Sequence, residues 1–317
     1  MQREGSPWTG LGVVCAKELS DHLGSVRMRI LEILMVLAAV GAAYVAAEQL
    51  NATVAESPFA FLKLFTTAPR PLPSLVSFLT FFVPLVAIGL GFDAVNGEHN
   101  RGTLSRILSQ PIYRDALLAG KFLAAMITLT LVLASLWLLT TGLGIFLLGL
   151  PPSSGSVARG LCFLVATVFY AGIWLALAML CSVLFRQTAT SALAALGIWL
   201  LFVVLWPIGA QFIAQVAHPA PFGSPAALFA QHELALALSR VSPNTLYGEV
   251  ITALLNPSVR SLGPVFAFQL ERAILGTPLP LGQSLIIVWP QLTSLVAGTI
   301  LLFAGTYLVF QRREIRA

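Results

Sequence analysis

Residues 122–150 read FLAAMITLTLVLASLWLLTTGLGIFLLGL, a run without a single Asp, Glu, Lys or Arg. Crossing about 30 Å of hydrocarbon takes about 20 residues of α-helix, so this run is longer than one crossing requires. The strands of outer-membrane barrels are about 10 residues long and alternate apolar with polar residues, and this run does not alternate. It therefore predicts a membrane-spanning helix.

Five further apolar runs along the 317-residue chain have the length that a bilayer crossing requires. The chain is 57% hydrophobic and 10% charged, whereas soluble domains are roughly 25% charged. We therefore expect an all-α polytopic membrane protein with a six-helix transmembrane domain at 30–310. The first run contains Glu32, and the fifth contains Pro207, where a kink is expected. The six runs lie at about 30–47, 75–95, 122–150, 161–185, 188–215 and 285–310.

Basic residues predict how these helices are oriented. With both termini in the cytoplasm, the inner segments hold 12 of the 18 Lys and Arg residues. This is the bias that the positive-inside rule describes. The net charge of +5 then reflects membrane topology, and no nucleic-acid partner is expected. The inner segments are 1–29, 95–121, 185–187 and 311–317, the last of which is a short cytoplasmic tail.

Two segments outside the six runs also have helical patterns. Residues 1–29 predict an amphipathic helix in the cytoplasmic interface, anchored by Trp8, with a polar tail as the alternative. Its apolar stripe consists of Trp8, Leu11, Cys15, Leu19, Leu23 and Val26. The outer segment 216–283 contains three helix-like stretches, at 224–240, 242–255 and 264–275. They are expected to cap the outer end of the bundle or to bind an extracytoplasmic partner.

A polar island separates the second apolar run from the third; it reads DAVNGEHNRGTLSRILSQP at positions 93–111. Leu104, Ile107 and Leu108 have the spacing of one apolar helix face. Thr103 is suited to cap such a helix, and Pro111 would end it within about two turns. The island therefore predicts a short helix across the ends of two spans, with an ordinary solvated connector as the alternative.

The island also carries a family resemblance. Asn-Gly-Glu-x-x-Arg-Gly-Thr-Leu at 96–104, Leu-Ser-Gln-Pro-Ile at 108–112 and Leu-Leu-Ala-Gly-Lys at 117–121 resemble the cytoplasmic loop of ABC-2 type transporter permeases. Within that family the match is to the subgroup that includes permeases used in maturation of nitrous-oxide reductase. The resemblance implies a type V ABC exporter-like fold with a coupling helix in the loop 96–112. Its implied ATPase-coupling interface consists of Glu98, Arg101, Gly102, Thr103, Leu104, Ile107, Leu108, Gln110 and Pro111.

The resemblance also implies partners. Two copies of a cytoplasmic ABC ATPase would bind ATP and Mg, a second permease copy or homologue would complete the path, and the complex would lie in a bacterial or archaeal plasma membrane. The chain's own motifs agree, because Gly120-Lys121 has Asp115 in place of the first phosphate-loop glycine and Phe122 in place of its hydroxyl residue. We expect no cofactor in this chain.

Catalytic and metal patterns are weak. His232-Glu233 begins a zinc-protease pattern, but Leu236 occupies the second histidine position, and the four histidines are dispersed. We therefore expect no catalytic residue and no metal site. Gln291, which follows Pro290 in the last span, is the best candidate for a polar group inside the membrane, either lining a path or packing against another helix.

The resemblance implies the permease subunit of an ATP-driven exporter, and export rests on the resemblance alone. The apolar path favours a lipid-like or amphipathic cargo. One alternative is a membrane scaffold that transmits ATPase work to an extracytoplasmic partner without moving cargo. A second is an ion-coupled secondary transporter. It is disfavoured because Glu32 and Asp93 lie at the ends of their spans, where acids pair or reach water.

Overall fold

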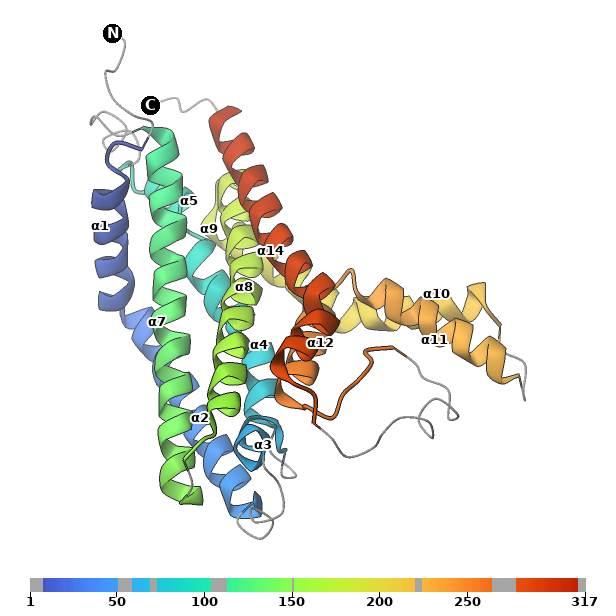
Figure 1. Cartoon of the computed structure of the whole chain (residues 1–317). Helices are drawn as coiled ribbons and strands as arrows, with labels where there is room; N and C mark the ends of the chain where they lie inside the picture. Colours follow the sequence, from blue (N-terminus) through green and yellow to red (C-terminus); the bar gives the residue numbers. More distant parts are fainter. Residues whose placement is uncertain are drawn as a thin grey trace.

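The computed structural model describes residues 8–50, 59–68, 73–103, 113–149, 151–219, 224–263 and 278–312. The secondary structure of these residues is entirely helical, and six helices are long and apolar enough to cross a membrane, which confirms the predicted fold class (Figure 1). The helices are α1 (Leu11–Gly24), α2 (Val26–Leu50), α3 (Ala60–Thr66), α4 (Leu75–Gly91), α5 (Asn96–Asn100), α7 (Arg114–Leu148), α8 (Ser154–Leu184), α9 (Thr188–Leu200), α10 (Trp206–Ala217), α11 (Pro225–Ser239), α12 (Pro243–Leu255) and α14 (Leu281–Arg312).

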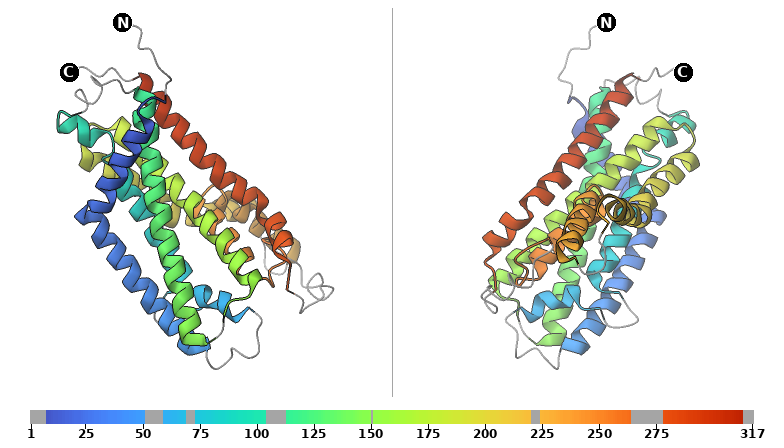
Figure 2. Two further views of the ribbon diagram at one scale, coloured as in Figure 1. Left: turned by 60° about the vertical axis from the view of Figure 1, so that its left-hand side comes forward. Right: turned by 90° about the vertical axis from the view of Figure 1, so that its right-hand side faces the viewer.

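Helix α8 lies at the centre of the bundle and contacts α4, α7, α9, α12 and α14 (Figures 1 and 2). Small residues allow this close packing. A Cβ added to Gly91 of α4 would lie 2.9 Å from the Cβ of Ala178 and 3.0 Å from the carbonyl oxygen of Leu175, both on α8. The end of α4 is therefore pressed directly against α8, and this contact positions the polar island that follows.

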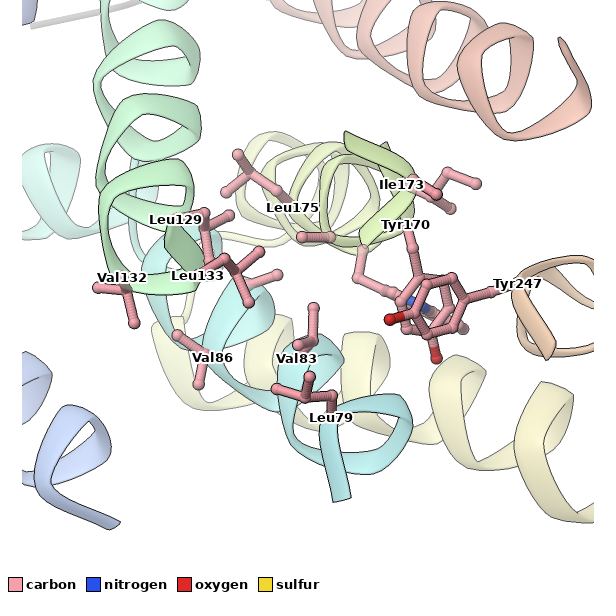
Figure 3. Packing of buried hydrophobic residues seen from close by; sticks show 14 of the residues in the cluster. Leu79, Val83, Val86, Leu129, Val132, Leu133, Tyr170, Ile173, Leu175 and Tyr247 are labelled. Atoms are coloured by element: carbon pink, nitrogen blue, oxygen red, sulfur yellow. The ribbon is translucent and has the colours of Figure 1, made fainter. Parts of the chain in front are cut away.

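The core fills the space between these helices. In Figure 3, Val83 of α4 and Leu133 of α7 point toward the side chains of α8. Tyr170 of α8 stacks on Tyr247 of α12, with ring centroids 4.1 Å apart and planes 4° from parallel. Helix α12 therefore packs inside the bundle, although the sequence placed it in a loop that would cap the outer end.

The outer segment differs from its expected outline in other ways. The fifth span continues to Ala217, two residues into the range 216–283. The first two expected stretches correspond to α11 and α12, and the third, at 264–275, falls outside the residues that the structure describes.

The kink expected at Pro207 is present. Helix α9 follows the bundle, a π-helical turn occupies Leu201–Leu205, and α10 then projects to the side together with α11 (Figure 1). Proline lacks the amide hydrogen of a regular turn, and π-helical turns are a common place for a helix to change direction. The indole nitrogen of Trp206 donates to the carbonyl oxygen of Leu238 over 2.8 Å, which holds α10 against α11.

Helix α1 packs along α7, and its buried side chains are Val14 and Glu18. A Cβ added to Gly120 of α7 would lie 2.8 Å from Val14, so the two backbones approach closely. Three residues of the expected apolar stripe, Leu11, Cys15 and Leu19, lie in α1 and are half-buried, whereas Trp8 precedes the helix and Val26 begins α2. Helix α1 also buries Glu18, which lies outside that stripe. It presents a carboxylate to α7 because α7 carries a buried cation there.

Candidate functional site

The polar island begins in a cluster of charged side chains that we call the polar junction: Glu18, Arg27, Asp93, Glu98, Arg101 and Lys121. These residues come from α1, α2, the turn after α4, α5 with its following turn, and α7. They line a cavity of about 470 Å³ at the end of the bundle that carries α5. The junction is therefore where four separate helices meet the start of the island.

Lys121 is the centre of the polar junction. Its side chain is 5% exposed, and its Nζ lies 2.7 Å from Glu98 Oε1 and 2.9 Å from Glu18 Oε1. Removing a buried charge from water is costly, and two opposite charges at this distance offset that cost. One ammonium on α7 thus binds both α1 and α5, and neither helix can move away without leaving a buried charge behind.

The charge of Glu18 is stabilised by its neighbours. Burial alone would raise the pKa of this carboxyl, but the ammonium groups of Lys121 and Lys17 outweigh burial and lower its pKa below the ordinary value. Lys17 lies 2.8 Å from both Glu18 and Asp21, and these contacts raise its pKa despite partial burial. The face of α1 that meets α7 therefore remains ionised.

The start of the island is also attached to α8 and α9. The hydroxyl of Ser182 accepts hydrogen bonds from the backbone amides of residues 95 and 96, at 3.0 and 3.2 Å, and donates to Asn96 Oδ1. The amide of Asn96 donates to the carbonyl oxygen of Phe185 over 3.2 Å. The hydroxyl of Ser191 donates to the carbonyl oxygen of Phe92. These bonds, of which those to Ser182 are buried, fix the position at which the island leaves α4.

Asp93 forms an ion pair with Arg27 at 3.1 Å, and the guanidinium lies over the ring of Phe92. The prediction that Asp93 is a paired residue at the end of its span is thus confirmed. Both side chains are partly exposed, so the pair contributes modestly to stability and mainly orients α2 against α4.

The structure describes four of the nine residues assigned to the coupling interface. Arg101 and Gly102 are exposed, and Gly102 has a φ of 68°, a left-handed conformation that favours glycine. Thr103 donates through its backbone amide and its hydroxyl to the carbonyl oxygen of Glu98, at 3.0 and 3.2 Å. The remaining five lie outside the described residues: Leu104, Ile107, Leu108, Gln110 and Pro111.

Glu98 lies differently from what a contact surface requires. It is 5% exposed, and its side chain faces Lys121 instead of the outside. Its second carboxylate oxygen is buried and has no partner among the described residues. Glu98 is buried because it pairs with the buried ammonium of Lys121, so we assign Glu98 as an anchor of the loop. The contact with an ATPase remains a prediction for the other eight residues.

Gln291 is buried and joins α14 to α12, because its Nε2 donates to Glu249 Oε2 over 2.7 Å. Glu249 in turn accepts two bonds from Arg240 Nε, at 3.0 and 3.1 Å. This is the helix-packing contact that was one of the two roles expected for Gln291. Sequence analysis missed Glu249 because it assigned α12 to an outer loop, where an acid needs no partner.

Arg159 was also missed. This side chain on α8 is 2% exposed, and one guanidinium nitrogen donates to the carbonyl oxygen of Leu254 over 2.9 Å and to Ser284 Oγ over 3.1 Å. The other donates to the carbonyl oxygen of Leu279. Arg159 thus ties α8 to the last turn of α12 and to the start of α14. Its only sequence signal was a lone charge shortly before an apolar run.

Comparison with known proteins agrees with this arrangement. Residues 13–315 match the family described as ABC-2 family transporter protein. The chain belongs to this family. It is 29% identical over 204 residues to the probable ABC transporter permease protein NosY of Stutzerimonas stutzeri. This aligned region covers 62% of this chain and 67% of that protein. It is 30% identical over 218 residues to the protein of the same name from Pseudomonas aeruginosa. That aligned region covers 68% of this chain and 74% of the relative. The chain is a multi-pass membrane permease subunit of an ABC transporter, a class that works with an ABC ATPase.

Proposed function

We propose that this permease exports its substrate across a bacterial or archaeal plasma membrane, driven by ATP hydrolysis in a separate cytoplasmic ATPase. Two ATPase copies would bind ATP and Mg, and a second permease would complete the path. In this proposal the end of the bundle that carries α5 faces the cytoplasm. The positive-inside rule supports this orientation, because basic residues lie at the helix ends and turns on this side: Arg27, Arg29, Arg101, Arg114, Lys121, Arg186 and Arg312.

The observation that carries the proposal is the attachment of the island to the bundle. Lys121 fastens α5 to α7 and α1, and Ser182 fastens the same segment to α8. A displacement of the loop 96–112 by an ATPase would therefore be passed to several spans at once. A solvated connector would not need two sets of buried bonds at its first turn, so the arrangement favours a force-bearing contact.

The decisive experiment removes the apolar face of the predicted coupling helix. The double variant Leu104→Asp with Ile107→Asp is expected to lose the ATPase during gentle purification while still inserting into the membrane. The matched control places the same charges at two exposed positions of α1, outside the six spans, Val13→Asp with Ala16→Asp. If the double variant still retained the ATPase, the coupling-helix assignment would be refuted.

A second candidate function is mechanical transmission to an extracytoplasmic partner without cargo. The specific observation in its favour is Arg159, which ties the far end of α8 to α12 and to the start of α14. Helix α8 therefore connects the start of the polar island, which Ser182 binds, to the outer segment. Under this candidate, sealed vesicles would show ATP turnover with no movement of cargo. Removing α11, which has no buried residue and lies outside the core, would abolish function through loss of the partner.

Two ion pairs of the bundle weigh against ion-coupled secondary transport. Asp93 is paired with Arg27, and Glu249 is paired with Arg240 and Gln291. Acids on an ion or proton path need to exchange partners, whereas these two have fixed cationic or amide partners.

A further inference from the structure

Two adjacent cavities form one groove at the opposite end of the bundle from the polar junction. The first, of about 530 Å³, lies between α3, the start of α4 and the end of α12. The second, of about 380 Å³, lies between α4, α12 and the π-helical turn at Val203. Val76, Ile251 and Thr252 line both cavities, so the two adjoin at these residues. We call them together the α4–α12 groove, and each has the size typical of a small-molecule site, about 300–1,000 Å³.

Among the described residues, the groove has a charged side chain at one end only. Lys63 of α3 is exposed and is the one charged residue among those that line the two cavities. No ion pair joins it to another residue within the described part of the chain. The cavity around Lys63 also contains hydroxyl and amide side chains: Thr66, Ser74, Thr252, Asn256 and Ser258. This end is suited to a polar group that carries one negative charge.

Away from Lys63 the groove becomes more apolar. Val76, Phe81 and Val203 line it there, and Phe81 is 47% exposed. The ring of Phe81 is held in place by an edge contact with the buried ring of Trp199, at a centroid distance of 5.1 Å. A hydrophilic anion would gain nothing from this part of the groove, whereas an acyl chain would bury its surface against it.

The inner wall of the groove is fixed before any ligand arrives. The hydroxyl of Tyr170 lies 2.9 Å from the carbonyl oxygen of Thr80 and 3.2 Å from Asn244 Oδ1, and both residues line the second cavity. Tyr170 is itself stacked on Tyr247 (Figure 3). These contacts hold α4 and α12 at a set distance, so the groove is preorganised, which lowers the entropic cost of binding.

We infer that the α4–α12 groove binds an anionic amphiphile, a lipid with one negatively charged headgroup. The headgroup lies at Lys63, and an acyl chain extends along Val76 toward Val203. This inference rests on the proposed export function, for which it names the substrate class. The charge asymmetry selects the lipid, because a zwitterionic headgroup would place a second cation beside Lys63.

The test measures binding to the full-length permease alone, in neutral detergent, without ATPase or nucleotide. A dansyl-labelled phosphatidylglycerol serves as the probe, and unlabelled phosphatidylglycerol, phosphatidylcholine and glycerol phosphate compete with it. We expect phosphatidylglycerol to displace the probe at a concentration about fivefold lower than phosphatidylcholine does. Glycerol phosphate is expected not to displace it. Equal competition by phosphatidylcholine, or displacement by glycerol phosphate, would overturn the inference.

Matched variants locate the site. Thr252 is exposed and lies where the two cavities meet, so Thr252→Trp fills the groove and is expected to abolish probe binding. Thr130→Trp, at an exposed position on α7, is the control and is expected to leave binding unchanged. Lys63→Gln is expected to remove the preference for phosphatidylglycerol, and Arg186→Gln, at the other end of the bundle, is expected to preserve it.

Unchanged binding in Thr252→Trp would place the lipid elsewhere and refute the site. Because the assay contains no ATPase, its failure would leave the coupling proposal standing. Retention of the ATPase by the Leu104→Asp, Ile107→Asp variant would refute coupling and leave lipid binding intact.

Discussion

Replacing Lys121 by methionine tests the polar junction most directly. The substitution keeps a similar side-chain length but removes the ammonium that lies 2.7 Å from Glu98 and 2.9 Å from Glu18. The two carboxylate side chains are 6% and 11% exposed, so they cannot regain hydration without local rearrangement. Breaking a buried ion pair from one side typically costs about 3–5 kcal/mol. With about 3 °C per kcal/mol, Lys121→Met is expected to lower the midpoint of thermal unfolding by roughly 10 °C.

The cause can be separated from a simple loss of packing. If the unpaired carboxylates produce the instability, neutralising them in the triple variant Lys121→Met, Glu18→Gln, Glu98→Gln should recover most of the lost stability. The assay is thermal unfolding of the purified permease in detergent, followed by its intrinsic tryptophan fluorescence. Arg186→Met removes one exposed charge at the same end of the bundle and should shift the midpoint by less than about 2 °C, since such surface changes stay within about 0.5 kcal/mol. A triple variant no more stable than Lys121→Met would refute the electrostatic explanation.

Three further predictions follow from other contacts. Gly91→Ala is expected to destabilise the permease by about 1–3 kcal/mol in the same thermal assay, because the added Cβ would lie 3.0 Å from a backbone oxygen of α8. Gly89→Ala is the control and should be tolerated, because its Cβ would meet one side-chain carbon at 3.6 Å. Gln291→Leu is expected to cost about 1–3 kcal/mol, because it removes a hydrogen bond to the buried carboxylate of Glu249; Gln291→Asn with full stability would contradict this. The pKa of Glu18 is lower in the folded protein than its ordinary value of 4.5, so the unfolded chain binds more protons in acid. The stability that this carboxylate contributes is therefore complete above pH 4.5, and it is lost as the pH falls through the folded pKa. Glu18→Gln should flatten the acid side of the unfolding profile, and an unchanged profile would show that another group is responsible.

The six spans could be predicted from sequence because a bilayer imposes a length on every crossing helix, and that length is visible in the uncharged runs. Span ends were less accurate: the third run was expected from 122, and α7 begins at Arg114. The difference arises because Lys121 interrupts the apolar pattern without interrupting the helix. A lysine can lie in the middle of a buried helix when two carboxylates pair with it. The partners of Lys121, Glu18 and Glu98, are distant in sequence, so a local pattern does not reveal them.

The same limitation explains the placement of α12. Its sequence is only moderately apolar, and it follows a span and precedes a loop, so a surface position was the simpler interpretation. Its burial depends on Tyr247 stacking on Tyr170 and on Arg159 binding its last carbonyl groups. Those partners lie on α8, about 80 to 95 residues earlier in the chain. Periodicity within one helix indicates which face of that helix is apolar. It does not indicate which distant side chain will form hydrogen bonds with a polar group of that helix.

The distribution of contacts along α8 determines how motion of the island could spread. Near one end, Ser182 binds the first turn of the island; near the other, Arg159 binds the segments that flank the outer loop. Between them, the close approach at Gly91 leaves no room for α4 to slide along α8. A loop displaced by an ATPase would therefore carry α4 and α8 together as one body. A disulfide between α4 and α8 should then leave ATP-driven function intact. Inhibition by this disulfide would mean that α4 moves independently of α8.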